Sequence, residues 1–244
     1  MYHGLGDNPN GIYDIDKDTF LKQMKMLKDY GFVVESFQKY FQRMKQGKIP
    51  KKYILLTFDD GYKSFLWANE VLLKFKFSGT FFITKNYCNL NQSSLDNTDL
   101  IELGSEMEVG SHSLSHPNLT ILDNKMQYNE LDDSKKWLED LLGKNIFSFS
   151  APGGYINQNI IDIAENIGYH FIGNSNEWYN TYFRFKDFQI INRIAMRNHY
   201  DLKTFKNIIF SQNFFLIKRK IRNSGLGLIK KIIPEKHINT LRKS

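Results

Sequence analysis

Cysteine, proline and long apolar runs are all scarce in this chain. A single cysteine, Cys88, among 244 residues excludes an intrachain disulfide framework and a zinc site built from several thiolates. Only five prolines occur, and no glycine- and serine-rich stretch indicates a flexible linker. No stretch approaches the roughly 18 apolar residues of a membrane-spanning helix. The content of 41% hydrophobic and 15% aromatic residues is nevertheless ample for a folded core.

The first residues carry no recognisable secretory signal. Met1-Tyr2-His3-Gly4 has neither a basic region nor an apolar run. Taken literally, this predicts a cytoplasmic protein. Tyr2-His3-Gly4 also looks like the end of a strand, which leaves open whether Met1 is the true start.

The net charge of +7 is concentrated near the end of the chain. From Ile217 to Ser244 there are nine Lys and Arg against one acid, Glu235, so the rest is nearly neutral. A neutral body argues against a nucleic-acid-binding face on the main domain, and nucleic-acid binding through the tail is only a distant alternative. We therefore divide the chain into a catalytic domain at 1–212 and a basic amphipathic helical tail at 213–244. The tail predicts peripheral contact with the inner face of a membrane, or else a solvated helix packed on the body.

Strand and helix patterns alternate along the body. Strands are predicted at 32–34, 53–58, 79–83, 107–109, 146–149, 169–172 and 188–191. Helices are predicted at about 18–30, 36–47, 63–77, 98–106, 123–142, 157–167 and 201–210. This alternation predicts an α/β fold with a mainly parallel sheet, either open or closed into a barrel. In both arrangements, chemistry is expected at the carboxyl ends of the strands.

Two carboxylates follow a predicted strand in Thr57-Phe58-Asp59-Asp60-Gly61. Side chains alternate along a strand, so Asp59 and Asp60 can point in different directions and hold different roles. The alternative is a turn with solvated acids, which Asp-Gly often forms. Taken alone, the motif does not decide between these interpretations.

Two histidines lie just after another predicted strand, in His112-Ser113-Leu114-Ser115-His116. If the segment forms a helical turn, the i and i+4 imidazoles can share one metal ion. Spacing alone is weak, since solvated or core histidines are common. Together with one carboxylate, however, they make a three-ligand site with an open position, as in hydrolytic metal centres.

A third candidate is Ser150-Ala151-Pro152-Gly153-Gly154, after the strand that ends near Phe149. By itself the segment reads as a turn. At the same end of the sheet as the other two motifs, its exposed amides are suited to face a developing oxyanion.

In order and spacing, these three motifs resemble the polysaccharide deacetylase family of carbohydrate esterases. Tyr2-His3-Gly4 and Asn192-Arg193-Ile194 also look like parts of that family. The resemblance spans about residues 1–212. It implies a distorted (β/α) barrel, which agrees with the alternation described above.

The resemblance also implies roles for individual residues. Asp60, His112 and His116 would bind a divalent metal, commonly zinc in this family. Asp59 would be the general base that takes a proton from the attacking water. The backbone amide of Gly153 would help to stabilise the tetrahedral oxyanion.

The sequence departs from the family at two places. Ser150 stands where many members have an arginine that orients the catalytic aspartate, and we expect Arg193 to substitute for it beside Asp59. The family's late histidine, the general acid, has no clean match. His3 is our preferred candidate for a site role, because His199 lies in a polar context typical of a solvated histidine.

The sequence therefore predicts a metal-dependent hydrolase that removes acetyl groups from N-acetylated sugars of a polysaccharide or a lipid-linked glycan. Two alternatives remain open. One is a metal-dependent hydrolase of a non-sugar amide, and the other is a degenerate carbohydrate-binding protein. Intact Asp59, Asp60, His112 and His116 argue against degeneration, because a binding module has little reason to keep a metal site.

Overall fold

The structure is a computed structural model that describes residues 1–7, 10–177, 180 and 187–210. Met1–Leu202 form one compact unit and the chain from Lys203 onward forms a second. Helix α7 (Leu202–Phe210) begins at this division. The basic tail predicted at 213–244 lies outside the described residues. None of the described helices has the length and apolar character needed to cross a bilayer.

Six parallel strands form the main sheet. They are β5 (Thr57–Asp60), β6 (Thr80–Ile83), β7 (Glu108–Ser111), β8 (Ser148–Ser150), β9 (Phe171–Asn174) and β10 (Gln189–Asn192). Their spatial order is β10-β9-β8-β7-β6-β5, so each strand lies beside its predecessor in the chain. The carboxyl ends of all six strands therefore point to the same side, where the predicted motifs were expected to meet.

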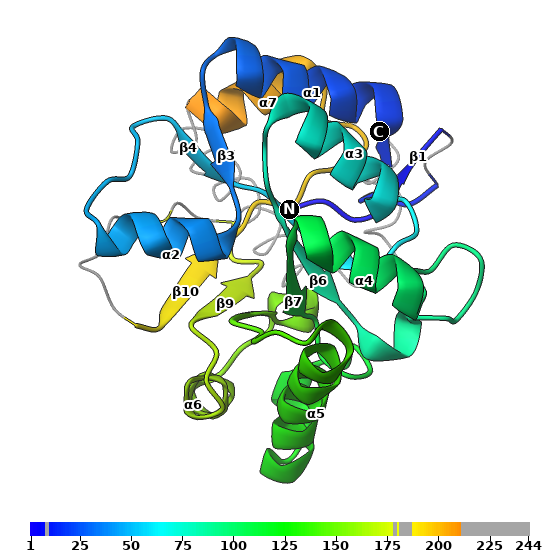
Figure 1. Cartoon of the computed structure of the whole chain (residues 1–244), viewed down its shortest axis with the longest axis vertical. Helices are drawn as coiled ribbons and strands as arrows, with labels where there is room; N and C mark the ends of the chain where they lie inside the picture. The colour runs from blue at the N-terminus through cyan, green and yellow to red at the C-terminus, as the bar shows by residue number, and fades with distance from the viewer. Residues whose placement is uncertain (8–9, 178–179, 181–186, 211–244) are drawn as a thin grey trace, which may run out of the picture. The chain divides into compact units, whose positions relative to one another are not determined.

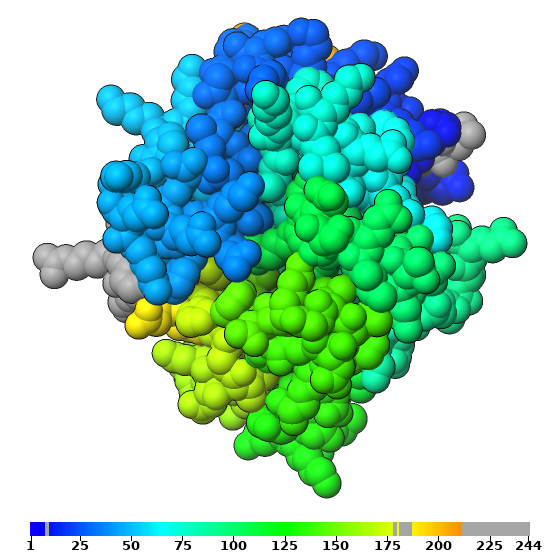
Figure 2. All heavy atoms as spheres, viewed as in Figure 1, coloured from blue at the N-terminus to red at the C-terminus, as the bar shows by residue number. Residues whose placement is uncertain are grey.

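Helices connect the strands and surround the sheet. The connections include α3 (Phe65–Phe75), α4 (Asn97–Glu106), α5 (Asn124–Leu142) and α6 (Gln158–Asn166). Figure 1 shows these helices around the curled sheet, with α5 and α6 on one side and α3 and α4 on another. In the same view, Figure 2 shows that helical side chains cover most of the strands. All four residues of β6, from Thr80 to Ile83, are fully buried, as expected for a strand that is covered on both faces.

The amino-terminal part adds two small parallel sheets. Strand β1 (Leu5–Gly6) pairs with β2 (Ile15–Asp16), and β3 (Val33–Glu35) pairs with β4 (Tyr53–Leu55). Helices α1 (Lys17–Asp29) and α2 (Phe37–Lys45) follow β2 and β3. Asp16 and Ser36 cap these helices, each accepting a hydrogen bond from a first-turn amide.

One predicted strand is divided in the structure. The run at 53–58 was expected to be continuous, but β4 ends at Leu55 and β5 begins at Thr57. Strand β4 pairs with β3, whereas β5 joins the main sheet beside β6. This largely apolar run has no periodicity that marks such a change of partner, so the division could not be predicted from the sequence.

The amino-terminal residues bridge the two edges of the main sheet. At one edge, Tyr2 donates its N–H to Thr57 O (2.8 Å) and accepts the N–H of Asp59 (2.9 Å). At the other, Met1 O accepts the N–H of Met196 at 2.9 Å, just after β10. The predicted distorted (β/α) barrel is thus confirmed for the body of the chain.

Candidate metal centre and active site

Strand β5 carries two neighbouring carboxylates that differ in their exposure to solvent. Asp59 is only 2% exposed, while Asp60, the last residue of the strand, is partly exposed. Asp60 has φ 91°, a conformation that non-glycine residues rarely adopt and that is concentrated at functional sites. The turn at Asp60 and Gly61 directs the second carboxylate towards the loop after β7.

Asp60, His112 and His116 form a triangle of ligand atoms within 4.8 Å of one another. Oδ1 of Asp60 lies 3.4 Å from Nε2 of His112 and 3.4 Å from Nε2 of His116. These separations are longer than ordinary N–H···O hydrogen bonds. Ligands about 2.0–2.1 Å from a tetrahedral metal lie about 3.4 Å apart, so the separation of Asp60 from each histidine matches that of ligands around a zinc-sized ion.

The histidines do not lie on a helical turn, so that part of the prediction was wrong. The segment after β7 is an irregular loop in which Ser113 (φ 69°) and His116 (φ 62°) are left-handed. The loop bends back on itself and brings the two imidazole centroids to 4.9 Å. The i and i+4 spacing correctly predicted that the two imidazoles lie close together. The helical turn that it predicted is replaced by a left-handed bend.

The orientation of His112 is fixed by the loop after β8. Its Nδ1 lies 2.7 Å from Ser150 O, and the side chain is buried. A carbonyl can only accept, so Nδ1 donates to it, and Nε2 is the ring nitrogen that faces Asp60. This hydrogen bond is the kind of outer support that metal-binding histidines usually have.

Arg193, from the segment after β10, forms a two-pronged ion pair with Asp59. Nη1 donates to Oδ1 at 2.7 Å and Nη2 donates to Oδ2 at 2.9 Å. Nη2 also donates to Ser150 Oγ at 2.6 Å, and that hydroxyl donates to Asp59 Oδ2 at 3.1 Å. The guanidinium therefore lies where the sequence suggested a substitute for the family's usual arginine.

The electrostatics of the site keep both carboxylates ionised. Burial alone would raise the pKa of Asp59, but the charge of Arg193 and that of His112 hold this pKa below its usual range. Burial also opposes ionisation of Asp60, yet its close contacts with the imidazoles of His112 and His116 hold its pKa well below the ordinary value. Both groups are thus acceptors at neutral pH.

Arg193 occupies space left by a glycine on the neighbouring strand. A Cβ added to Gly173 in β9 would lie 2.8 Å from Nε of Arg193. Nε itself donates to Asn174 O at 3.1 Å. The absence of a side chain at position 173 allows the guanidinium to reach Asp59.

Gly153 lies in a tight turn after β8, as predicted. Its φ is 62°, and a Cβ there would lie 2.7 Å from Cε2 of Tyr155. Both the backbone conformation and the available space therefore require glycine. Ser150, the last residue of β8 just before this turn, contacts both His112 and Asp59. The turn therefore lies at the edge of the site.

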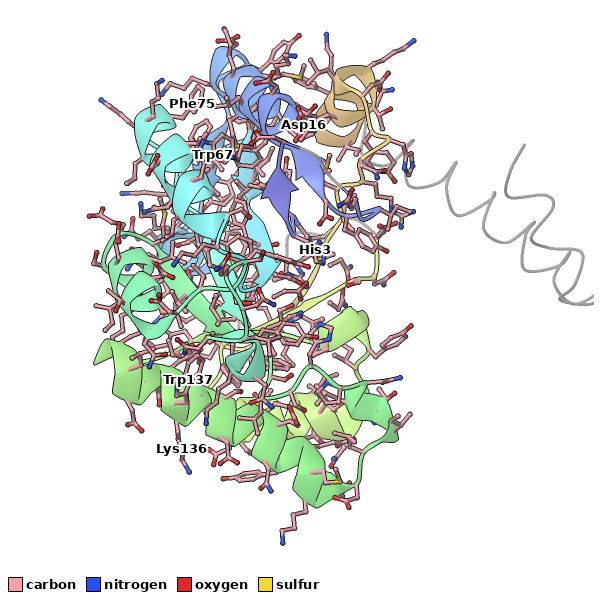
Figure 3. The ribbon with its side chains drawn as sticks, turned by 90° about the vertical axis from the view of Figure 1, so that its right-hand side faces the viewer. His3, Asp16, Trp67, Phe75, Lys136 and Trp137 are labelled. Carbon is pink, nitrogen blue, oxygen red and sulfur yellow. The ribbon has the colours of Figure 1, made fainter. Side chains whose placement is uncertain are left out.

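His3 lies near the same groups. Burial lowers its pKa, against the opposing influence of Asp59 and Asp60. The ring packs on Tyr13 at 5.0 Å, and Nδ1 is buried without a hydrogen-bond partner among the described residues. Figure 3 shows His3 below the short amino-terminal strands and above α5.

Two contributors were missed in the sequence. Ser150 was considered only for the arginine that it replaces, although its hydroxyl and carbonyl contact Asp59 and His112. Glu130 of α5 binds the backbone of the histidine loop. The only available signal was an acid at a position of α5 that helical periodicity places on the buried side.

A family model for polysaccharide deacetylases matches residues 46–172, just over half of the chain. This chain belongs to the polysaccharide deacetylase family. The match contains both carboxylates, both histidines and the Gly153 turn. His3 and Arg193 lie outside it.

Curated relatives of this chain include peptidoglycan and polysaccharide deacetylases. The peptidoglycan-N-acetylmuramic acid deacetylase PdaA of Bacillus subtilis is 27% identical over 150 residues, which are 59% of this chain and 54% of that protein. The poly-beta-1,6-N-acetyl-D-glucosamine N-deacetylase of Staphylococcus aureus is 24% identical over 191 residues, 68% of this chain and 66% of the enzyme. The chain thus spans about half to two thirds of these relatives.

Solved structures share the fold. The deacetylase PplD of Streptococcus pyogenes, solved in complex with acetate, superposes with a TM-score of 0.77 at 23% identity. The superposition covers 86% of this chain and 96% of that one. The curated relatives are deacetylases, which hydrolyse amide bonds.

Proposed function

We propose that this chain is a metal-dependent deacetylase that hydrolyses the acetamide of N-acetylated sugar residues in a glycan. One observation carries the proposal: the Asp60–His112–His116 triangle lies next to a second carboxylate, Asp59, that is held by an arginine. A pure binding module needs neither the triangle nor the ionised neighbour. Membership of the polysaccharide deacetylase family supports a sugar amide over a non-sugar amide.

We propose zinc as the metal, held by Asp60, His112 and His116. Two imidazoles and one carboxylate, with a free fourth position, are a donor set that suits zinc in hydrolytic enzymes. Bound there, the ion would supply Lewis-acid polarisation of the acetamide oxygen and lower the pKa of water.

The chain's own residues supply the remaining groups. Asp59, kept ionised by Arg193, accepts the proton of the attacking water as general base. The amide of Gly153 donates to the oxygen that gains charge as the carbonyl becomes tetrahedral. His3, in its protonated form, donates a proton to the departing sugar amine, so that the amine leaves as a neutral group and the imidazole becomes neutral.

The reaction class is tested by acetate release from N-acetylglucosamine oligomers and from a lipid-linked N-acetylated glycan. The chain is stripped with a chelator, dialysed, and reloaded with one equivalent of zinc. We expect release only from the loaded chain, and none from fully de-N-acetylated oligomers. Stoichiometric zinc binding without release from any sugar would favour a non-sugar amide or a carbohydrate-binding role.

The role of His3 is tested with two leaving groups. For His3→Asn we expect the rate on the N-acetylated sugar to fall about 10²–10⁴-fold. Hydrolysis of 4-nitrophenyl acetate should change little, because nitrophenolate leaves without a proton. Equal losses on both substrates would show that His3 does not act as the acid.

Membrane contact through the basic tail is a separate proposal, supported only by the charge pattern of the sequence. Deletion of residues 216–244 should release the protein from vesicles that contain anionic lipid. Equal vesicle binding by the shortened chain would contradict it.

A further inference from the structure

The loop that carries His112 and His116 has the least regular backbone of the site. Strand-like geometry ends at Ser111, and the next described helix-like turn begins at Leu119. Two of its residues, Ser113 and His116, adopt left-handed conformations, which are unfavourable for residues other than glycine. Such conformations persist only where the surroundings hold them.

A single carboxylate on α5 holds the middle of this loop. Oε2 of Glu130 accepts the backbone N–H groups of Leu114 and Ser115, both at 2.9 Å. Its other oxygen, Oε1, accepts the hydroxyl of Ser115 at 2.6 Å. Three donors from two consecutive residues thus meet one side chain from another element.

The charge of Glu130 strengthens these contacts. The residue is 9% exposed, and no described basic side chain forms an ion pair with it. A buried carboxylate needs hydrogen bonds to offset its lost hydration, and bonds to an ionised acceptor are about twice as strong as neutral ones. The loop amides supply most of that compensation, so carboxylate and loop geometry depend on each other.

The contacts lie between the two left-handed residues. Leu114 and Ser115 separate Ser113 from His116, and the N–H of His116 donates to Ser113 Oγ at 3.0 Å. One helical turn along α5, Ser134 Oγ lies 2.7 Å from Ser111 Oγ at the start of the loop. Fixing the amides of 114 and 115 therefore fixes the direction in which His116 leaves the turn.

The position of His116 matters because its imidazole is the most exposed ligand of the centre. Its side chain is 29% exposed, against 2% for His112. His112 has its own support in Ser150 O, whereas the ring of His116 is stacked on Tyr87 at 5.5 Å. The backbone of the loop thus does more to place His116 than it does to place His112.

We propose that Glu130 is a positioning residue that sets the metal affinity of this centre by holding the His112–His116 loop in its left-handed turn. This inference rests on the proposed metal centre. Glu130 contacts neither the ligand atoms nor the space beside Asp59, so its effect is on the occupancy of the site and not on the chemical step.

The test measures zinc affinity by competition with a chromophoric chelator, which needs no enzymatic activity. Variants are Glu130→Ala, which removes the acceptor, and Glu130→Gln, which keeps one acceptor oxygen without the charge. Asp133→Ala is the matched control, because Asp133 is exposed on the same helix. The melting temperature of each metal-free chain and acetate release at saturating zinc are measured alongside.

We expect zinc affinity to fall about 10–100-fold in Glu130→Ala and by a smaller factor in Glu130→Gln, with no change in Asp133→Ala. At saturating zinc, kcat should return to within about threefold of the unaltered chain, because the ligands themselves are intact. A merely structural role would lower the metal-free melting temperature and leave the affinity unchanged. If Glu130→Ala does not fold, Glu130→Gln decides.

The possible failures are distinguishable. Equal zinc affinity in the Glu130 variants and the control overturns this inference and leaves the proposed function intact. Tight zinc binding by the unaltered chain without acetate release overturns the proposed function. The zinc affinities of the Glu130 variants would still test the positioning role of Glu130. An unaltered chain that binds no zinc overturns both.

Discussion

Among the residues that the structure describes, two arginines form a two-pronged pair with a carboxylate, one in the site and one far from it. Arg193 meets Asp59 at 2.7 and 2.9 Å, and Arg43 meets Glu35 at 2.5 and 2.8 Å. The donors and acceptors match, but the surroundings differ. The side chains of Arg193 and Asp59 are 4% and 3% exposed, against 34% and 15% for Arg43 and Glu35.

The difference shows how burial changes the effect of an arginine on the pKa of the carboxylate that it contacts. At the surface pair, a hydrogen bond from Arg43 is the main cause that lowers the pKa of Glu35. In the site, burial is the largest influence on Asp59 and opposes its charge, so Arg193 is needed to keep this residue ionised. The Arg43–Glu35 pair connects α2 to β3. The Arg193–Asp59 pair keeps a buried carboxylate ionised, so that it can accept a proton.

The largest effect on this comparison is expected from Arg193→Lys. Lysine is a point charge that cannot form both prongs, so the pKa of Asp59 should rise. A base must be deprotonated to act, so the acidic limb of the kcat/KM profile should move to higher pH. At neutral pH, activity should fall about 10²-fold.

The matched control is Arg43→Lys, which should leave the profile in place. A pH profile of Arg193→Lys that superposes on that of the unaltered chain would contradict the role of this arginine.

A smaller effect is expected from Gly173→Ala. The new Cβ would lie 2.8 Å from Nε of Arg193 and must displace it. We expect activity to fall about 10-fold and the free energy of unfolding in urea to fall by about 1–3 kcal/mol. Gly104→Ala is the control, since its Cβ would meet the flexible end of Leu142 at 3.0 Å, far from the site. Normal activity in Gly173→Ala would show that the guanidinium does not need this space.

The smallest effect is expected from Glu35→Gln, measured as stability at two pH values. The pKa of Glu35 is lowered in the folded chain, so its contribution is present above the unfolded pKa of about 4.3 and is lost as the pH falls through the folded value. The variant should be less stable by about 1 kcal/mol at pH 7, and the difference should shrink as the pH is lowered below the unfolded pKa of about 4.3. Acetate release should not change. The same stability difference at both pH values would argue that packing, and not charge, is lost.

The sequence was most informative where chemistry follows a strand. The pairs of polar residues after the apolar runs indicated which strand ends would meet, because parallel strands end on the same side. Arg193 was singled out because Ser150 replaces the family's usual arginine, which would leave Asp59 without the opposite charge that keeps it ionised. The irregular histidine loop was not foreseen, since a pattern of spacing cannot distinguish a helical turn from a left-handed bend held by a distant carboxylate.

Contacts between distant elements could not be predicted either. Glu130 reads as an ordinary acid on an amphipathic helix, and its contact with the loop exists only once α5 packs beside β7. The division at Leu56 and the space left by Gly173 likewise depend on which strands become neighbours. Local patterns carry no information about such pairings, which tertiary packing decides.

The central claim is that the neighbouring acids of β5 divide the work: Asp59 acts on protons and Asp60 binds the metal. The most direct measurement is bound zinc per chain, together with acetate release, for Asp59→Asn and Asp60→Asn side by side. We predict that Asp59→Asn keeps about one zinc and loses activity by at least about 10²-fold, while Asp60→Asn loses the zinc itself. Zinc loss in both variants, or normal activity in Asp59→Asn, would contradict this division.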